Sequence, residues 1–342
     1  MFKNYFRIAL RRFLRQKMNT SINILGLSMG IAASIVIFLF AHNELTYDQF
    51  NKNADQIYLI YKERITPTGT QITRDTWLPM AEALKNEYSS IANTVRVWDS
   101  DEWVEFGNQK FEENITYADR QLLDIFAFRV AQGSGDVNSS EIHSAVVSQE
   151  IAHKYFGDAD PIGKTIRIAF KTDYIVRGVL AYIPQNSSIQ INIMVSPKSA
   201  PYYERFANSW DASWIYTFLQ LKPNTPKEDL ESQFPKFITK TWSEEENQRT
   251  KLKLLALTDL HNETTGARTN AYILLVIAFI VLAIASINFM NLTTARSLER
   301  AREIGGLAGD LPGCACQRQQ QPAVSDHRGV SRQRVRGARA AQ

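Results

Sequence analysis

Cysteine is nearly absent from this 342-residue chain. Its two cysteines, Cys314 and Cys316, lie near the end, so the long stretch before them can form neither a disulfide bond nor a thiolate metal site. The pair has only His327 nearby, which falls short of the ligand set of a zinc site. We therefore predict no metal site and no cofactor.

Assembled catalytic motifs are missing as well. The five histidines are scattered, no His-Glu-x-x-His pair occurs, and no serine occupies a Gly-x-Ser-x-Gly elbow. FGDADPIGKT ends in Gly163-Lys164-Thr165 and suggests a nucleotide loop, but five residues separate its glycines, two of them acidic. A phosphate loop needs four residues there, after a strand and before a helix, whereas we expect a helix and then a strand. The sequence thus predicts that the chain is not an enzyme.

Acidic residues are absent from positions 1–43, which carry six Lys and Arg, whereas residues 44–268 carry 24 Lys and Arg against 31 Asp and Glu. The net charge of +4 therefore hides a basic beginning and an acidic middle. Nucleic-acid binding requires clustered basic surface, which the large middle section lacks, so we predict no nucleic-acid partner. The two parts are expected to face different compartments.

No charged residue occurs from Met18 to Asn43. About 20 apolar residues in a helix cover the roughly 30 Å of a bilayer core, so Ile22–Ala41 is predicted to cross a membrane. A cleaved signal peptide or a buried core helix are the alternatives, but a signal peptide has a shorter apolar region and a small-residue cleavage site. We predict an uncleaved anchor.

Small residues recur every four positions in this segment, at Gly26, Gly30 and Ser34. Such spacing places them on one face, where a second helix can approach closely. The alternative is that glycine is simply common in membrane helices. These three residues are our candidate helix-packing site.

The first seventeen residues separate into a basic stripe and an apolar face at helical spacing, which predicts an amphipathic helix at the lipid interface. Their positive charge places the N-terminus in the cytoplasm and the following section outside. Asn270–Asn291 is a second uncharged span that returns the chain to the cytoplasm. After it, LTTARSLERAREIG interleaves acidic and basic residues three or four apart and is expected to be a short cytoplasmic helix.

The middle section mixes strand and helix patterns, which predicts an α+β domain of two lobes between two transmembrane α-helices. Gly107-Asn108 suits a tight hairpin turn. The expected helices span residues 76–88, 120–126, 149–156 and 225–237, the last with Pro235 as a breaker near its end. The expected strands begin at Ile57 and Val95 and also cover residues 144–148, 164–169, 174–181, 189–195, 214–221 and 252–257.

Taken together, the chain resembles the MacB/FtsX-type permeases of ABC transporters, in the form common in Bacteroidetes-like bacteria. Five stretches carry the resemblance: NYFRIALRRFLRQKMNTSINILGLSMGIA, ELTYDQFNKNADQIY, LLDIFAFRVAQG, KYFGDADPIGKTI with RGVLAYIPQNSS, and NLTTARSLERAREIG. They extend over residues 4–305.

This resemblance implies a division of the chain, a partner and a location. The expected parts are an amphipathic helix (1–18), transmembrane helix 1 (19–43), a MacB-like periplasmic core domain (44–268), transmembrane helix 2 (269–292), a cytoplasmic coupling helix (293–306) and a tail (307–342). The helix 293–306 would meet a separate ABC ATPase through Arg296, Glu299, Arg300, Arg302, Glu303 and Gly305. The implied location is the bilayer of the bacterial inner membrane, with the chain in a homodimer or pseudo-dimer of permeases that exports or extrudes a substrate when ATP is hydrolysed.

The tail departs from the family. From Leu307 onwards the chain has six Arg, no Lys and no aromatic residue, where family members continue with a basic helix and further spans. We therefore expect an aberrant or disordered tail that reflects truncation or a frame shift after about residue 305. The alternative function is a two-span receptor with a periplasmic ligand-binding domain, for which a signalling module is expected after the second span. Fold does not identify the substrate.

Overall fold

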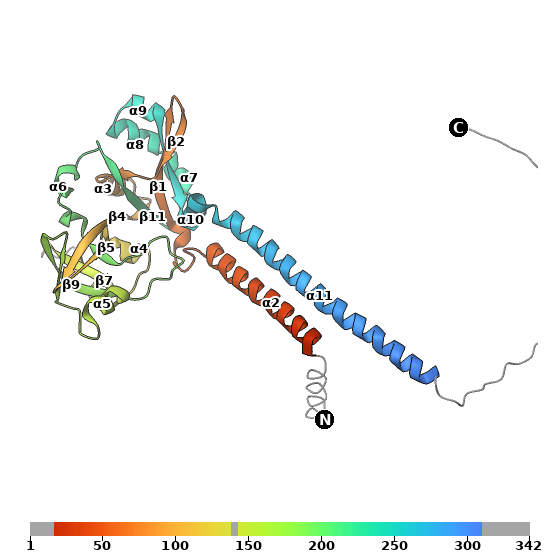
Figure 1. Cartoon of the computed structure of the whole chain (residues 1–342). Helices are drawn as coiled ribbons and strands as arrows, with labels where there is room; N and C mark the ends of the chain where they lie inside the picture. The colour runs from red at the N-terminus through yellow and green to blue at the C-terminus, as the bar shows by residue number, and fades with distance from the viewer. Residues whose placement is uncertain (1–16, 138–142, 310–342) are drawn as a thin grey trace, which may run out of the picture. The chain divides into compact units, whose positions relative to one another are not determined.

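The computed structural model describes residues 17–137 and 143–309. The expected amphipathic helix, except for its last two residues, and the tail after Gly309 lie outside this range. The chain divides into two compact units, Ile24–Ala285 and a second formed by Met1–Asn23 with Ser286–Gln342. The unit Ile24–Ala285 contains the α+β domain, residues 24–45 of the first apolar helix and residues 267–285 of the second. Figure 1 shows the domain and both helices.

Two long helices, α2 (Lys17–Leu45) and α11 (Ala267–Gly309), flank the domain in sequence. Each contains a 25-residue segment that is long and apolar enough to cross a membrane. The segment is Ser21–Leu45 in α2 and Ala267–Asn291 in α11. Large apolar side chains on both point outward; Met29 is 70% exposed and Phe279 is 73% exposed. Apolar surface of this extent is stable in lipid and costly in water.

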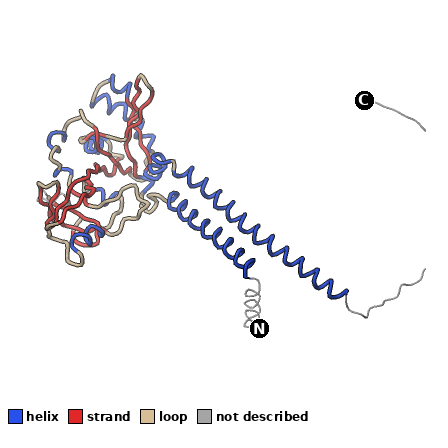
Figure 2. Tube along the Cα trace, in the orientation of Figure 1, coloured by secondary structure: helices blue, strands red, loops and turns tan. Residues whose placement is uncertain are grey.

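The described part of the domain is built on one twelve-stranded sheet in the order β12-β1-β11-β4-β5-β10-β7-β9-β6. Its strands are drawn in red in Figure 2. Outside this path, β2 pairs with β1, β3 with β11, and β8 with β4 and β9. The strands are β1 (Ile57–Thr66), β2 (Gly69–Thr73), β3 (Thr76–Trp77), β4 (Ile91–Phe106), β5 (Gln109–Ala118), β6 (Val130–Gly133), β7 (Ser144–Ser148), β8 (Thr165–Ile168), β9 (Thr172–Leu180), β10 (Ile193–Val195), β11 (Ser213–Leu221) and β12 (Thr250–Ala256).

Short helices cover this sheet. They are α3 (Met80–Glu87), α4 (Gln121–Ile125), α5 (Gln149–Phe156), α6 (Tyr203–Phe206), α7 (Lys227–Glu231), α8 (Phe234–Thr241), α9 (Glu244–Arg249) and α10 (Leu257–Thr265), with 3₁₀ turns η1 (Ala54–Gln56) and η2 (Pro197–Ser199). The predicted hairpin is confirmed, because Phe106 pairs with Gln109 and Gly107 has the positive φ of 59° that such a turn requires.

The core consists of three hydrophobic clusters along this sheet. A central cluster contains Phe126, and each of the two lobes has a cluster of its own. β1 contributes to two of them because alternate side chains point to opposite faces: Leu59 joins the central cluster and Ile60 the cluster under α7 and α8. The mixed α+β class is confirmed, and its two lobes share one sheet.

The expected helix over residues 76–88 is wrong at its beginning. Thr76–Trp77 forms β3, and the helix starts only at Met80, after Pro79. Thr76 is fully buried, where its hydroxyl donates to the carbonyl oxygen of Ile215 and lies 2.7 Å from the hydroxyl of Thr217. These partners on β11 are distant in sequence, so local propensity could not reveal the strand.

Pro235 begins a helix and does not end one. The single helix expected over residues 225–237 is two, because α7 ends at Glu231 and α8 begins at Phe234 with Pro235 in its first turn. A first-turn residue needs no intrahelical N–H bond, which suits proline.

Other boundaries also differ from those expected. The expected strand over residues 189–195 is confined to β10, and α9 and α10 on either side of β12 were not predicted.

Candidate functional site at the joint between the domain and the two helices

The domain meets the ends of α2 and α11 at a set of residues that we call the joint: 44–51 after α2, 186–188 in the loop before β10, and 257–268 through α10 to the start of α11. All belong to the unit Ile24–Ala285. Two of the stretches that carry the family resemblance, ELTYDQF and PQNSS, meet here.

Asp48 is the centre of the first half of the joint. It is fully buried, and its backbone N–H donates to the carbonyl oxygen of Asn186 at 2.8 Å. Its carboxylate accepts from the backbone N–H of Ser188 at 2.8 Å and from the Ser188 hydroxyl. Asn186 Nδ2 in turn donates to the carbonyl oxygen of Thr46 at 3.1 Å. Burial raises the pKa of the Asp48 carboxyl above its usual range, while the hydrogen bonds from Ser188 oppose that rise.

His261 on α10 is the centre of the second half. Its Nε2 lies 2.7 Å from Oε2 of Glu44, one residue before the end of α2. Tyr47 stacks on the imidazole with a centroid distance of 3.6 Å and an interplanar angle of 3°. The end of α2 is thereby bonded to the short helix that leads into α11.

The step from α10 into α11 is fixed by Arg268. Its guanidinium lies 2.8 Å from the Asp259 carboxylate and also donates to the carbonyl oxygen of Thr258 at 3.0 Å. Its backbone N–H donates to Oδ1 of Asn262 at 3.0 Å. Gly266 separates the two helices in the left-handed conformation (φ 66°), in which a side chain would be strained.

Two of the candidate helix-packing residues lie against α11. A Cβ built on Gly30 would come within 2.6 Å of the Cβ of Ala285, and the Ser34 hydroxyl donates to the carbonyl oxygen of Ala278 at 3.1 Å. Gly26 is half-buried on the same helix. Gly30 thus occupies a position where even one methyl group does not fit without movement.

All six candidate coupling residues lie on α11, whose helical backbone runs without a break from Ala267 to Gly309. The separate short helix that we expected after the second span is therefore part of the same helix. Helical spacing puts positions 296, 300 and 303 on one side of it.

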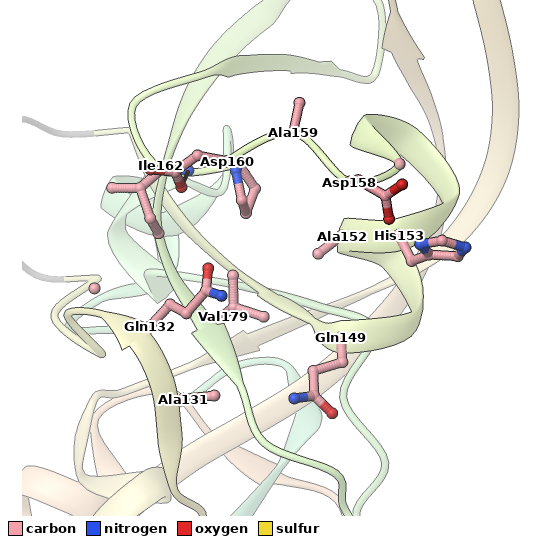
Figure 3. Close-up of a pocket in the computed structure, with 13 residues that line it drawn as sticks. Ala131, Gln132, Gln149, Ala152, His153, Asp158, Ala159, Asp160, Ile162 and Val179 are labelled. Carbon is pink, nitrogen blue, oxygen red and sulfur yellow. Dashed lines mark hydrogen bonds between the residues drawn. The ribbon is translucent and has the colours of Figure 1, made fainter.

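The FGDADPIGKT loop forms one wall of a cleft of about 690 Å³ (Figure 3). The loop faces β6 and β9, and α5 closes the other side. Asp160 turns back to accept from the backbone N–H of Ile162 at 3.0 Å, and the N–H of Gly163 donates to the carbonyl oxygen of Val176 at 2.8 Å. A helix precedes the loop and a strand follows, as predicted, so the N–H groups of these two residues serve the turn and no phosphate cradle forms. Within the described ranges, no group of three or more His, Cys, Asp or Glu residues is placed to hold a metal ion.

The joint residues were not identified from the sequence. Asp48 and Ser188 are 140 positions apart, and Glu44 and His261 are 217 apart, so their pairing depends on the fold. The signal that was available was the presence of both segments among the stretches shared with a family.

The fold and the joint together define a class of protein. An α+β domain that lies between two apolar helices in the sequence, and is bonded to the ends of both, is the arrangement of a membrane protein with a domain outside the bilayer.

Comparison with known proteins gives the family. Residues 20–237 match the model of the MacB-like periplasmic core domain, and the chain belongs to this family of MacB/FtsX-type permeases of ABC transporters. No curated protein gives a significant match.

Comparison with solved structures gives further matches. A permease-protein domain from Porphyromonas gingivalis has a TM-score of 0.53 at 19% identity, over 60% of this chain and 91% of that one. The periplasmic region of MacB from Actinobacillus actinomycetemcomitans has a TM-score of 0.45 at 15% identity, over 63% and 92%. The extracellular domain of the noncanonic ABC-type transporter YknZ from Gram-positive bacteria has a TM-score of 0.43 at 11% identity, over 58% and 99%. The first of these shares the fold of this chain.

Proposed function

We propose that this chain is a permease subunit that couples ATP hydrolysis by a separate ABC ATPase to movement of its periplasmic domain, for export or extrusion of a substrate. The chain would cross the inner membrane twice, with a cytoplasmic N-terminus and the domain at residues 44–268 in the periplasm. The other parts would be the amphipathic helix (1–18), the two transmembrane helices (19–43 and 269–292), the coupling helix (293–306) and the tail (307–342). It would work as a homodimer or pseudo-dimer. The chain's membership of a permease family does not favour the receptor alternative.

The observation that carries this proposal is the joint. Glu44 at the end of α2 and Tyr47 just beyond it both contact His261, while Arg268 ties the start of α11 to Asp259. A shift of either helix therefore acts on the same short segment of the domain. Packed elements with two discrete arrangements are the usual means of passing a rigid-body movement across a protein.

The input to that movement would be the helical segment 293–306. In our proposal Arg296, Glu299, Arg300, Arg302, Glu303 and Gly305 meet the ATPase, and the movement passes along α11. The alternative is that this charged segment is only solvated. Reversing the charges of Arg300 and Glu303 together should abolish stimulation of the ATPase in a reconstituted pair, whereas reversing Glu245 and Arg249, a surface pair on α9, should not. Unchanged stimulation in the first variant would leave the segment without a coupling role.

The joint is tested by a variant that breaks only its polar bond. His261→Phe keeps a ring against Tyr47 but removes the contact with Glu44. The measurement uses nanodiscs that contain the chain and the ATPase, with Cys314 and Cys316 replaced by serine. A fluorescent donor is attached to the cysteine of Asp211→Cys, and the acceptors are labelled lipids. Fluorescence energy transfer between donor and acceptors should change when ATP is added. We expect His261→Phe to bind the ATPase normally but to reduce this change.

Glu87→Gln is the matched control for the joint variant, because Glu87 pairs with Lys240 at the surface of the other lobe. It should leave the ATP-dependent change in energy transfer intact. An equal change in wild type and His261→Phe would refute the proposed role of the joint.

The proposed topology has a separate test. Single cysteines at exposed positions of the domain should react with an impermeant thiol reagent in cells whose outer membrane alone has been permeabilised. Labelling that requires lysis of the inner membrane would place the domain in the cytoplasm and overturn the orientation.

A further inference from the structure

A second cleft, of about 290 Å³, is lined partly by joint residues, among them Tyr47, Ser188 and His261, and partly by the sheet of the domain. Its floor is the face of the sheet where Leu59, Val97 and Phe218 lie on neighbouring strands. Ile189 and Leu260 add apolar surface from two sides. This size suits a small headgroup with the first carbons of a chain, since ligand pockets start at roughly 300 Å³.

The cleft is next to the ends of both apolar helices. Tyr47, which lines it, comes two residues after α2, and Thr264 comes three residues before α11 begins. Because the spans of these helices cover 25 residues each, their domain-side ends coincide with the expected membrane surface. A molecule whose apolar part remains in the bilayer can therefore reach the cleft.

Two opposite charges line the cleft without pairing. Arg74 is half-buried, and among the residues that the structure describes it has no hydrogen-bond or ion-pair partner. Asp99 is on β4, where its Oδ1 accepts from the Thr116 hydroxyl at 2.8 Å and its carboxylate forms no ion pair with any described residue. The Arg74 guanidinium is only partly hydrated and the Asp99 carboxylate is exposed, so both can form charge-assisted hydrogen bonds with a ligand.

The charged groups of the joint already have partners. Glu44 and His261 bond to one another, and Asp48 is bonded to Ser188. Arg74 and Asp99 are therefore the groups available to an incoming ligand. Such a ligand needs an anionic group, a cationic group and an apolar portion.

We propose that this cleft binds a zwitterionic amphiphile, with a phosphate or carboxylate on Arg74, an ammonium group on Asp99 and the first methylene groups on Leu59, Val97 and Phe218. A phosphoethanolamine headgroup has this chemistry. It could come from a membrane lipid or from a soluble phosphate ester without an apolar chain, and the position beside the helix ends points to the lipid. Since Tyr47 and His261 also line the cleft, the bound molecule would contact both halves of the joint.

The test uses the full chain in maltoside micelles and calorimetric titration with three probes. They are a dihexanoyl phosphoethanolamine lipid, the corresponding phosphoglycerol lipid without an ammonium group, and glycerophosphoethanolamine without acyl chains. We expect the first to bind most tightly. Arg74→Gln should weaken its binding by about tenfold or more, the usual effect of losing a charge-assisted hydrogen bond. Asp99→Asn should remove the preference for phosphoethanolamine over phosphoglycerol.

Arg120→Gln is the matched control, because Arg120 is exposed and pairs with Asp124 away from the cleft. It should bind the first probe like wild type, and melting temperatures will verify that all variants are folded. Equal affinity of wild type and Arg74→Gln would overturn the site. Equal affinity for the probe without acyl chains would overturn the amphiphile and leave a soluble ester, and a preference for the phosphoglycerol lipid would overturn the zwitterion.

Discussion

Asp48 is an acid that the fold removes completely from water and satisfies with backbone and hydroxyl donors. Because burial raises its pKa in the folded state, the folded chain holds the proton more firmly than the unfolded chain. The resulting stabilisation is full below the ordinary pKa of about 3.9 and is lost as the pH rises through the raised value.

Asp48→Asn should therefore change how stability depends on pH. The amide oxygen can still accept from the Ser188 N–H, but the residue no longer titrates. Relative to the variant, wild type should lose stability as the pH rises from about 4 towards neutrality. Thermal melts of both full-length chains in the same micelles across this range will show it; parallel curves would contradict the prediction.

Glu113 is the second buried acid with a defined set of partners. It is 6% exposed, and its Oε1 accepts from Lys154 Nζ at 2.6 Å and from the Tyr155 hydroxyl at 2.9 Å, which joins α5 to β5. Burial raises the pKa of Tyr155, and the hydrogen bond to Glu113 adds to the rise, so the phenol stays protonated and donates.

Glu113→Gln should lower the free energy of unfolding by about 1–2 kcal/mol, because it removes a charge-assisted bond and leaves Lys154 beside an uncharged group. Asp124→Asn removes an exposed carboxylate paired with Arg120 and should cost less than about 1 kcal/mol. Denaturant titrations of the two variants compare these costs. Equal losses would show that burial of Glu113 adds nothing.

At the scale of elements, the close approach of α2 and α11 depends on the absence of a side chain at position 30. Gly30→Ala places a methyl group 2.6 Å from the Ala285 Cβ and should push the helices apart, with a lower melting temperature of the full chain in micelles. Ala285→Gly frees that space, so the double variant should recover most of the loss. A loss in the double variant equal to the sum of the two single losses would mean that these two residues do not pack against each other.

Elements with strong local signals could be predicted from the sequence. The strand 144–148 and the helix 149–156 were expected with the observed bounds. The structure shows why their local signals are strong: four of the strand's five residues are buried, and the Ser148 hydroxyl caps the helix by accepting from the Ile151 N–H. β3 was missed because its partners on β11 lie far along the chain. The order of the strands in the sheet and the contacts of the joint could not be predicted from the sequence for the same reason. Glu44 and His261, for example, are 217 positions apart.

At the scale of the whole molecule, the described core of the domain lies between the two apolar helices. The three clusters use residues from Ile57 to Leu260, all twelve strands lie in that range, and no cysteine occurs there. Glu44 and Arg268, which form joint contacts, lie outside this range, one before it and one after it in the sequence. These contacts fix the ends of the domain where the two apolar helices begin.

A fragment cut at Glu44 and Arg268 should therefore fold alone, since its length is sufficient to bury a core. We expect a cooperative melt that neither chelator nor reductant changes. A shorter fragment, Ile57–Ala256, keeps the sheet but loses Leu257 and Leu260 from the central cluster together with the joint. It should be less stable by about 2 kcal/mol for each buried leucine. If the longer fragment aggregates while the full chain is folded, the domain needs its membrane helices and the boundaries at 44 and 268 are wrong.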